Sequence, residues 1–83
     1  MRYSFKPRGV CAYEISFDID NNIVSNVEFS GGCNGNGKGV AGLAEGMPAD
    51  EVIKRLEGIT CGFKPTSCPD QLAKGIKKAL EEN

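Results

Sequence analysis

The chain of 83 residues contains 10 basic residues, 11 acidic residues, four cysteines and no histidine, and its formal net charge is −1. This length allows one small domain, residues 1–83; the balanced charge argues against nucleic acid as a partner, and no apolar run reaches the roughly 18 residues of a membrane span. Because histidine is absent, the chain has no Ser–His or Cys–His nucleophile, and a metal site would have to be built from sulfur, with carboxylates as helpers.

The N-terminal segment is predicted to be a short strand, because Tyr3 and Phe5 alternate with polar residues until Pro7-Arg8-Gly9 interrupts the pattern. Residues 1–9 lack the long apolar core of a signal peptide. We therefore expect a cytoplasmic protein. In that compartment, paired cysteines are more often metal ligands or redox groups than structural disulfides.

A β-hairpin is predicted over residues 11–29. Alternate positions of its first strand share one face, which carries Cys11, Tyr13, Ile15, Phe17 and Ile19. Asp20-Asn21-Asn22 has turn chemistry, since aspartate and asparagine tolerate the left-handed conformation. The return strand follows, with one face that carries Ile23, Val27 and Phe29.

The predicted hairpin brings two cysteines together. If it closes around Asn21 and Asn22, residues that lie opposite each other have numbers that add up to about 42–44. Cys11 and Cys33 satisfy this relation, so we expect them about one cross-strand spacing apart at the open end of the hairpin. This convergence depends on the position of the turn and does not presuppose a metal.

The glycine-rich segment Gly31–Gly39 is expected to be a loop. Its sequence resembles the phosphate-binding pattern G-x-x-x-x-G-K-[ST], but Gly39 replaces the Ser/Thr that would hold Mg²⁺, and the chain has no room for the supporting parallel sheet. We therefore exclude a nucleotide hydrolase. A weaker phosphate or nucleotide site stays open, built from backbone N–H groups and a lysine at Gly35, Asn36, Gly37 and Lys38. The alternative, which the spacing alone favours, is a turn that positions Cys33.

Three helical segments are predicted in the second half of the chain. The first has apolar residues at helical spacing, although Gly42 weakens it: Val40, Leu43, Ala44 and Met47. Pro48 can open the second, which Gly58 ends and whose stripe is Val52, Ile53 and Leu56. The last runs from about Pro69 to Leu80, with an apolar face of Leu72, Ala73, Ile76, Ala79 and Leu80. We therefore predict an α+β fold, in which an antiparallel hairpin or three-stranded sheet packs against two or three helices.

The segment from Cys61 to Asp70 carries two cysteines and two prolines directly before the last predicted helix. Pro69 suits the first turn of a helix, where a missing N–H costs nothing. This makes Cys68 the expected N-cap, and the unpaired backbone N–H groups near its sulfur would lower the pKa of the thiol. Asp70, in the first turn, is interpreted as structural because its charge favours the helix dipole.

The four cysteines are the main candidate site. The hairpin unites Cys11 and Cys33, and six residues separate Cys61 from Cys68 on a loop short enough to fold back on itself. Four thiolates predict a tetrahedral metal site, with Zn²⁺ as the default occupant and an iron–sulfur cluster as the alternative. The spacing is not the close C-x-x-C pair, so two interpretations stay open beside the metal: a redox pair of Cys61 and Cys68, or inert cysteines.

The chain resembles the TSCPD-domain family, which is named after the pentapeptide Thr66-Ser67-Cys68-Pro69-Asp70. The resemblance extends from Gly9 to Leu80 and includes, in order, Gly31-Gly32-Cys33-Asn34-Gly35-Asn36, Glu45-Gly46-Met47, Glu51-Val52-Ile53 and Gly58-Ile59-Thr60-Cys61-Gly62. The ordered set is far more specific than any one motif. It implies that Cys33, Cys61 and Cys68 match family cysteines and that Cys11 matches the additional cysteine of a short branch, in which the domain is the entire protein.

Related domains occur at the C-terminal end of cobalamin-dependent ribonucleotide reductases, where a separate and much larger barrel performs the reduction. The resemblance therefore implies a link to ribonucleotide reduction without its catalytic apparatus. We expect an accessory module with no activity alone, whose partner is a ribonucleotide reductase or another nucleotide enzyme. A metal-binding module, a thiol-redox protein and a nucleotide-binding or phosphate-binding regulator are the three functions that follow as expectations.

Overall fold

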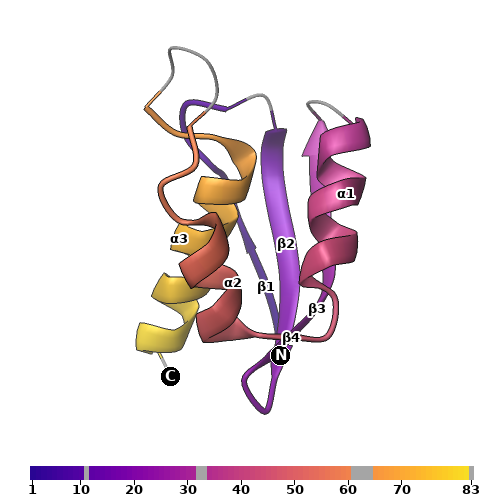
Figure 1. Ribbon diagram of the computed structural model, residues 1–83, viewed down its shortest axis with the longest axis vertical. Helices are drawn as coiled ribbons and strands as arrows, with labels where there is room; N and C mark the ends of the chain where they lie inside the picture. The colour runs from indigo at the N-terminus through magenta and orange to yellow at the C-terminus, as the bar shows by residue number, and fades with distance from the viewer. Residues whose placement is uncertain (11, 32–33, 61–64, 83) are drawn as a thin grey trace.

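The computed structural model describes residues 1–10, 12–31, 34–60 and 65–82 (Figure 1). Within these ranges the elements are β1 (Arg2–Phe5), β2 (Ala12–Asp20), β3 (Ile23–Gly31), α1 (Asn34–Ala44), β4 (Met47–Pro48), α2 (Ala49–Leu56) and α3 (Cys68–Glu82). The strands form one antiparallel sheet in the order β1-β2-β3-β4. The predicted α+β fold is confirmed, and the short strand β4 adds to the sheet that the sequence predicted.

β2 and β3 form the central hairpin. Their paired positions run from Ala12–Gly31 to Asp20–Ile23, and the numbers of each pair add up to 43 or 44, as predicted. The two asparagines of the turn have φ angles of 51° and 65°, which asparagine adopts more readily than most residues. The position of the turn and the register of the hairpin are therefore confirmed.

A bulge in β2 changes the face that the first residues of this strand present. The register shifts between Ala12 and Glu14, so Tyr13 is the extra residue. Ala12 is buried, whereas 69% of Tyr13 is exposed. The prediction that Tyr13 shares the core face with Ile15 was therefore wrong, because the alternation is interrupted before it reaches the start of the strand.

A second irregularity lies in β3. Ser16 pairs with Glu28 and Asp18 pairs with Ser25, so β3 contains one extra residue between these two pairs. Asn26, which lies in this stretch of β3, has a φ of 50°. Val24 and Val27, three residues apart, are both buried, and Ile23 is exposed. The predicted face was therefore right for Val27 and wrong for Ile23, since one extra residue reverses the alternation beyond it.

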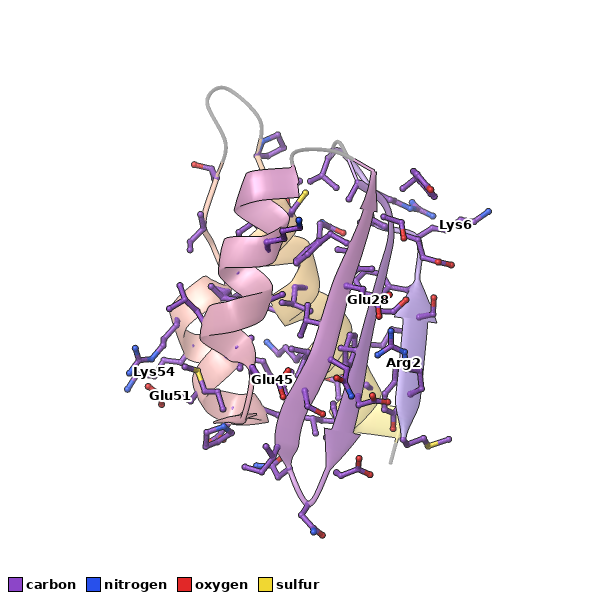
Figure 2. All side chains as sticks on the ribbon, turned by 90° about the vertical axis from the view of Figure 1, so that its right-hand side faces the viewer. Arg2, Lys6, Glu28, Glu45, Glu51 and Lys54 are labelled. Carbon is purple, nitrogen blue, oxygen red and sulfur yellow. The ribbon has the colours of Figure 1, made fainter. Side chains whose placement is uncertain are left out.

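The core lies between the sheet and the helices. It joins residues of the hairpin with residues of all three helices: Ile15, Phe17, Ile19, Val24, Val27, Ala44, Ala49, Val52, Leu72, Ile76 and Ala79. In Figure 2, α3 lies behind the sheet, and Arg2 and Glu28 lie on the face turned to the viewer. Arg2 donates to the backbone oxygen of Asn26 at 2.6 Å and lies 3.4 Å from the Glu28 carboxylate. This face is therefore polar, and the opposite face carries the core.

Among the predicted helix starts, that of α1 differs most from the structure. α1 starts at Asn34 and includes most of the glycine-rich segment, which was expected to be a loop before a helix near Val40. Leu43, placed on its apolar face, is 75% exposed. α2 follows Pro48 directly, as predicted. None of the described helices combines the length and the apolar character needed to cross a bilayer.

Candidate functional site

The predicted four-cysteine site falls mostly outside the described residues. Cys68 is described: it is the first residue of α3, half-buried, and its thiol is free. Cys11, Cys33 and Cys61 lie outside the described residues. Among the described residues, no three Cys, Asp or Glu side chains come together as a metal site. The four-cysteine site therefore stays a prediction, and the geometry around Cys68 is what the structure adds to it.

The N-cap of α3 is Ser67. Its carbonyl oxygen accepts the first helical hydrogen bond, from the backbone N–H of Gln71 at 2.9 Å, and its hydroxyl oxygen accepts from the backbone N–H of Asp70 at 3.2 Å. Cys68 and Pro69 are then the first two helical residues. The prediction of Cys68 as the N-cap was wrong by one residue, because a hydroxyl is among the best capping acceptors.

Asp70 is the centre of a buried hydrogen-bond network. Its residue exposure is 1%. One carboxylate oxygen, Oδ1, accepts from the backbone N–H of Gly58 at 2.7 Å, and the other, Oδ2, accepts from the hydroxyl of Thr66 and lies 3.0 Å from the Nζ of Lys74. Burial by itself raises the pKa of the carboxyl, but the hydrogen bonds and the charge of Lys74 outweigh it and hold the pKa of Asp70 below its usual range. Asp70 is therefore ionised at neutral pH.

The Thr66 hydroxyl is itself held in place from the N-terminal part of the chain. The side-chain amide of Gln71 donates to the hydroxyl oxygen of Thr66 at 3.0 Å, and the carbonyl of that amide accepts from the backbone N–H of Arg8 at 3.2 Å. A Cβ on Gly9, whose φ is +73°, would lie 3.2 Å from the Thr66 methyl group. The connection between β1 and β2 therefore packs directly against the start of α3.

Ser67 connects the segment after α2 to the beginning of α3. Its hydroxyl donates to the backbone oxygen of Ile59 at 2.7 Å, while its oxygen caps α3. Together with the bond from Gly58 to Asp70, this contact fastens the chain before Cys61 to the chain around Cys68. Each of these hydroxyl and carboxylate groups has a partner, and no buried side-chain N or O atom in the described part of the chain lacks one.

One comparison with known proteins identifies the family. The sequence model of the TSCPD domain matches residues 1–80. The chain belongs to the TSCPD domain family. No curated protein and no solved structure matches the chain. The match covers nearly the whole chain and confirms the resemblance that the pentapeptide and the other motifs indicate.

In the pentapeptide of this TSCPD domain, three residues form a hydrogen-bonded frame, and a fourth, Cys68, carries a thiol. Thr66, Ser67 and Asp70 hydrogen-bond the turn together, and Pro69 occupies the first helical turn, where its missing N–H costs nothing. Cys68 contributes a half-buried thiol at the start of α3. The sequence did contain a signal for this frame that we did not use: Ser67-Cys68-Pro69-Asp70 fits the capping pattern [ST]-x-x-[DE].

The second candidate site of the TSCPD domain lies in α1. The segment with Gly35, Asn36, Gly37 and Lys38 is helical rather than a loop, so any phosphate would meet the first turn of a helix, whose N–H groups lack intrahelical partners. Lys38 is exposed, and the first turn carries no acidic residue. Phosphate binding at these residues stays a prediction.

Proposed function

We propose that this TSCPD domain is a small binding module that holds one structural metal ion through Cys11, Cys33, Cys61 and Cys68, with zinc as the occupant. Four thiolates in a tetrahedron are a common structural zinc site, and such a site contributes directly to folding. A domain of 83 residues has a thin core, and small domains often need this kind of support. The observation that carries the proposal is a chain of contacts that links the segments next to all four cysteines.

The first link joins the neighbours of Cys11 and Cys33. Ala12, which follows Cys11, pairs with Gly31, which lies two residues before Cys33. The beginning of β2 and the end of β3 lie at the same end of the molecule, together with the beginning of α3 (Figure 1). Because two residues span at most about 7 Å, this pairing supports a site to which both cysteines contribute.

The second link joins the neighbours of Cys11 and Cys68. Gly9, two residues before Cys11, lies against the methyl group of Thr66, two residues before Cys68. The hydrogen bond from the backbone N–H of Arg8 to the side chain of Gln71 fastens the same two segments on the other side of Cys68. These contacts support a common site for cysteines that are more than fifty residues apart in the sequence.

The third link joins the neighbours of Cys61 and Cys68. The hydroxyl of Ser67, directly before Cys68, donates to the backbone oxygen of Ile59, two residues before Cys61. With the other two links, it connects the segments that flank all four cysteines. A metal bound by these sulfurs would supply a fixed cross-link between three distant parts of the chain, which is a structural and not a catalytic role.

Metal analysis tests this proposal. Protein purified without added metal is expected to contain about one equivalent of zinc, and serine in place of any one of the four cysteines is expected to lower that content. Ser4→Ala, on the polar face of the sheet, is the control that should leave it unchanged. A zinc and iron content below about 0.2 equivalents in the original protein would contradict the proposal. Iron and sulfide in place of zinc, with visible absorbance, would instead identify an iron–sulfur cluster.

A thiol-redox function is the first alternative, and the half-buried, free thiol of Cys68 at the start of α3 favours it. Two thiols, those of Cys61 and Cys68, would reduce a disulfide such as oxidised glutathione, forming one protein disulfide and two molecules of reduced glutathione. Mass spectrometry of metal-free protein in glutathione buffers measures this exchange. A Cys61–Cys68 disulfide that forms reversibly, in protein purified without zinc, would favour this function over the metal site.

Phosphate or nucleotide binding at the beginning of α1 is the second alternative. The observation that favours it is the exposed Lys38 in the second turn of a helix whose first turn has no acidic residue. Amide NMR during titration with a nucleoside triphosphate is expected to shift the signals of Gly35 to Lys38. Unchanged signals there, at millimolar nucleotide, would exclude this function.

We further propose that the domain acts in the cytoplasm as an accessory of a ribonucleotide reductase or another nucleotide enzyme, with no activity of its own. Membership of the TSCPD family supports this proposal, because related domains are attached to such reductases. Analytical ultracentrifugation of the domain mixed with the reductase of the same organism measures the association. Independent sedimentation of the two proteins at tens of micromolar would contradict it.

A further inference from the structure

We infer that Asp70 is a positioning residue: its buried carboxylate fixes the two ends of the segment between Gly58 and Thr66 and so sets the places of the cysteines next to them, without binding the metal itself. This inference rests on the proposed metal function and adds to it a residue that is not a ligand. It goes beyond the structural role that a first-turn aspartate has through the helix dipole alone.

The carboxylate of Asp70 joins both ends of one segment. Its Oδ1 atom accepts from the backbone N–H of Gly58 at 2.7 Å, and its Oδ2 atom accepts from the Thr66 hydroxyl. Cys61 lies in the sequence between these two partners, and Cys68 lies two residues after Thr66. Both ends of the segment are bound to a single carboxylate. The folded domain has therefore already lost much of the chain entropy that bringing these ends together costs, before any ligand binds.

Asp70 is not available as a ligand. Both of its carboxylate oxygens have protein donors, the Nζ of Lys74 lies 3.0 Å from Oδ2, and only 1% of the residue is exposed. A metal ion would have to replace these donors and reach a buried carboxylate. The residue therefore acts through the backbone and the hydroxyl group that it holds.

A relay of donors sets the direction of the bond between Thr66 and Asp70. The backbone N–H of Arg8 donates to the side-chain carbonyl of Gln71, and the amide nitrogen of Gln71 donates to the oxygen of Thr66. With its oxygen already accepting, the Thr66 hydroxyl turns its proton toward Asp70. The relay begins three residues before Cys11, so the same carboxylate is connected to the segments of three of the four cysteines.

Groups that hold metal ligands in place have a measurable effect on affinity. Removing such a supporting hydrogen-bond partner typically weakens metal binding by about 10- to 100-fold, because ligands that are no longer held in place lose more conformational freedom when they bind. Asp70→Asn keeps the shape of the side chain and removes its charge and one acceptor oxygen. We expect this variant to bind zinc at least about tenfold more weakly.

The experiment compares zinc affinity with stability. Competition with a chromophoric chelator measures the affinity of the original protein, of Asp70→Asn and of Val52→Ala. Val52 is buried in α2 and belongs to the core, so its substitution lowers stability without touching the hydrogen bonds of Asp70. When the variants are compared at equal fractions of folded protein, the zinc affinity of Val52→Ala is expected to lie within about twofold of that of the original protein. Equal weakening by both substitutions, or none by Asp70→Asn, would overturn the inference.

A pair of substitutions at Thr66 covers the case in which Asp70→Asn does not fold. Thr66→Val keeps the shape and removes the hydroxyl, whereas Thr66→Ser keeps the hydroxyl and removes the methyl group that faces Gly9. Weak zinc binding by the valine variant and near-original binding by the serine variant is the expected result. The reverse order would show that packing against Gly9 matters and the bond to Asp70 does not.

A metal-free readout separates this inference from the proposed function. In metal-free protein, Asp70→Asn is expected to accelerate both the alkylation of Cys68 and the hydrogen exchange of the Gly58 amide by about tenfold or more, at equal folded fraction, and Val52→Ala is expected to change neither. If the original protein binds no metal but these rates change as expected, the metal function fails and the positioning role stands. Unchanged rates would overturn the positioning role whether or not zinc binds.

Discussion

The ring of Tyr13 lies directly over the backbone of Gly31. A Cβ on Gly31 would lie 2.5 Å from Cδ1 and 2.8 Å from Cε1 of that ring. Tyr13 is the extra residue of the bulge in β2, and Gly31 has a φ of +80° at the end of β3, opposite Ala12. The exposed tyrosine therefore covers the last pair of the hairpin, whose residues Ala12 and Gly31 lie one and two positions from Cys11 and Cys33 in the sequence.

Gly31→Ala is expected to destabilise the domain by about 1–3 kcal/mol, because a side chain is strained at this positive φ and its Cβ would displace the tyrosine ring. Urea unfolding followed by circular dichroism measures the free energy of unfolding. A change below about 0.5 kcal/mol, the usual range of a surface substitution, would contradict the close contact between Tyr13 and Gly31.

The same substitution at Gly42 is the matched control, and its expected effect has the opposite sign. Gly42 lies in α1, and a Cβ at this position would have no described atom of another element within 4 Å. Alanine is a better helix former than glycine by about 0.8–1.0 kcal/mol per residue, so Gly42→Ala should raise the free energy of unfolding by up to that amount. Destabilisation by Gly42→Ala would mean that α1 is packed on this side as well.

Gly75→Ala tests how β1 packs on α3. A Cβ at Gly75 would overlap the ring of Phe5, which also packs edge-on against Phe17 at a centroid distance of 6.4 Å. Overpacking a core typically costs about 1–3 kcal/mol, and we expect a loss of that size in the same unfolding experiment. Phe5→Leu should relieve part of it when the two substitutions are combined. Additive losses in the double variant would contradict direct contact between the two positions.

The parts of the fold that depend on short-range signals could be predicted from the sequence. The hairpin turn at Asn21 and Asn22, and with it the register, follows from residues that tolerate a positive φ between two alternating strands. The two bulges could not be predicted in this way, because alternation contains no information on where one extra residue is inserted. Tyr13 and Ile23 were placed on the wrong face for that reason.

The candidate site was predictable where its groups are close in sequence and not where they are distant. The pentapeptide marked the start of α3 within one residue, since proline and a capping hydroxyl act locally. The bonds from Gly58 to Asp70 and from Arg8 to Gln71 join residues 12 and 63 positions apart, and no local pattern indicates them. The helix at Asn34 was also missed, because packing against β3 overrides the low helix propensity of its glycines.

Substitutions at Ser67 and Cys68 test which residue caps α3. In metal-free protein, Ser67→Ala is expected to lower the free energy of unfolding by about 1–2 kcal/mol. The substitution removes the hydroxyl that accepts from the backbone N–H of Asp70 and donates to the backbone oxygen of Ile59. Cys68→Ala, at the next position, is expected to change it by less than about 0.5 kcal/mol. A larger loss at Cys68 than at Ser67 in the absence of metal would contradict the assignment of the cap.

The pH dependence of stability is expected to report the ionisation of Asp70. Hydrogen bonds from Thr66 and Gly58 and the charge of Lys74 hold the pKa of this carboxyl below its usual range despite its burial, so the folded domain binds its proton less readily than the unfolded chain does. The stability that this ionisation contributes is therefore fully present above the unfolded pKa of about 3.9 and is lost as the pH falls through the folded pKa.

Urea unfolding of metal-free protein between pH 2 and pH 7 measures this contribution when the original protein is compared with Asp70→Asn. At neutral pH the variant should be less stable by about 1–3 kcal/mol, since the donors of Gly58 and Thr66 lose an ionised acceptor. The difference should stay constant down to about pH 5 and shrink below about pH 4. A difference that does not change over the whole range would show that Asp70 contributes through its shape and hydrogen bonds and not through its charge.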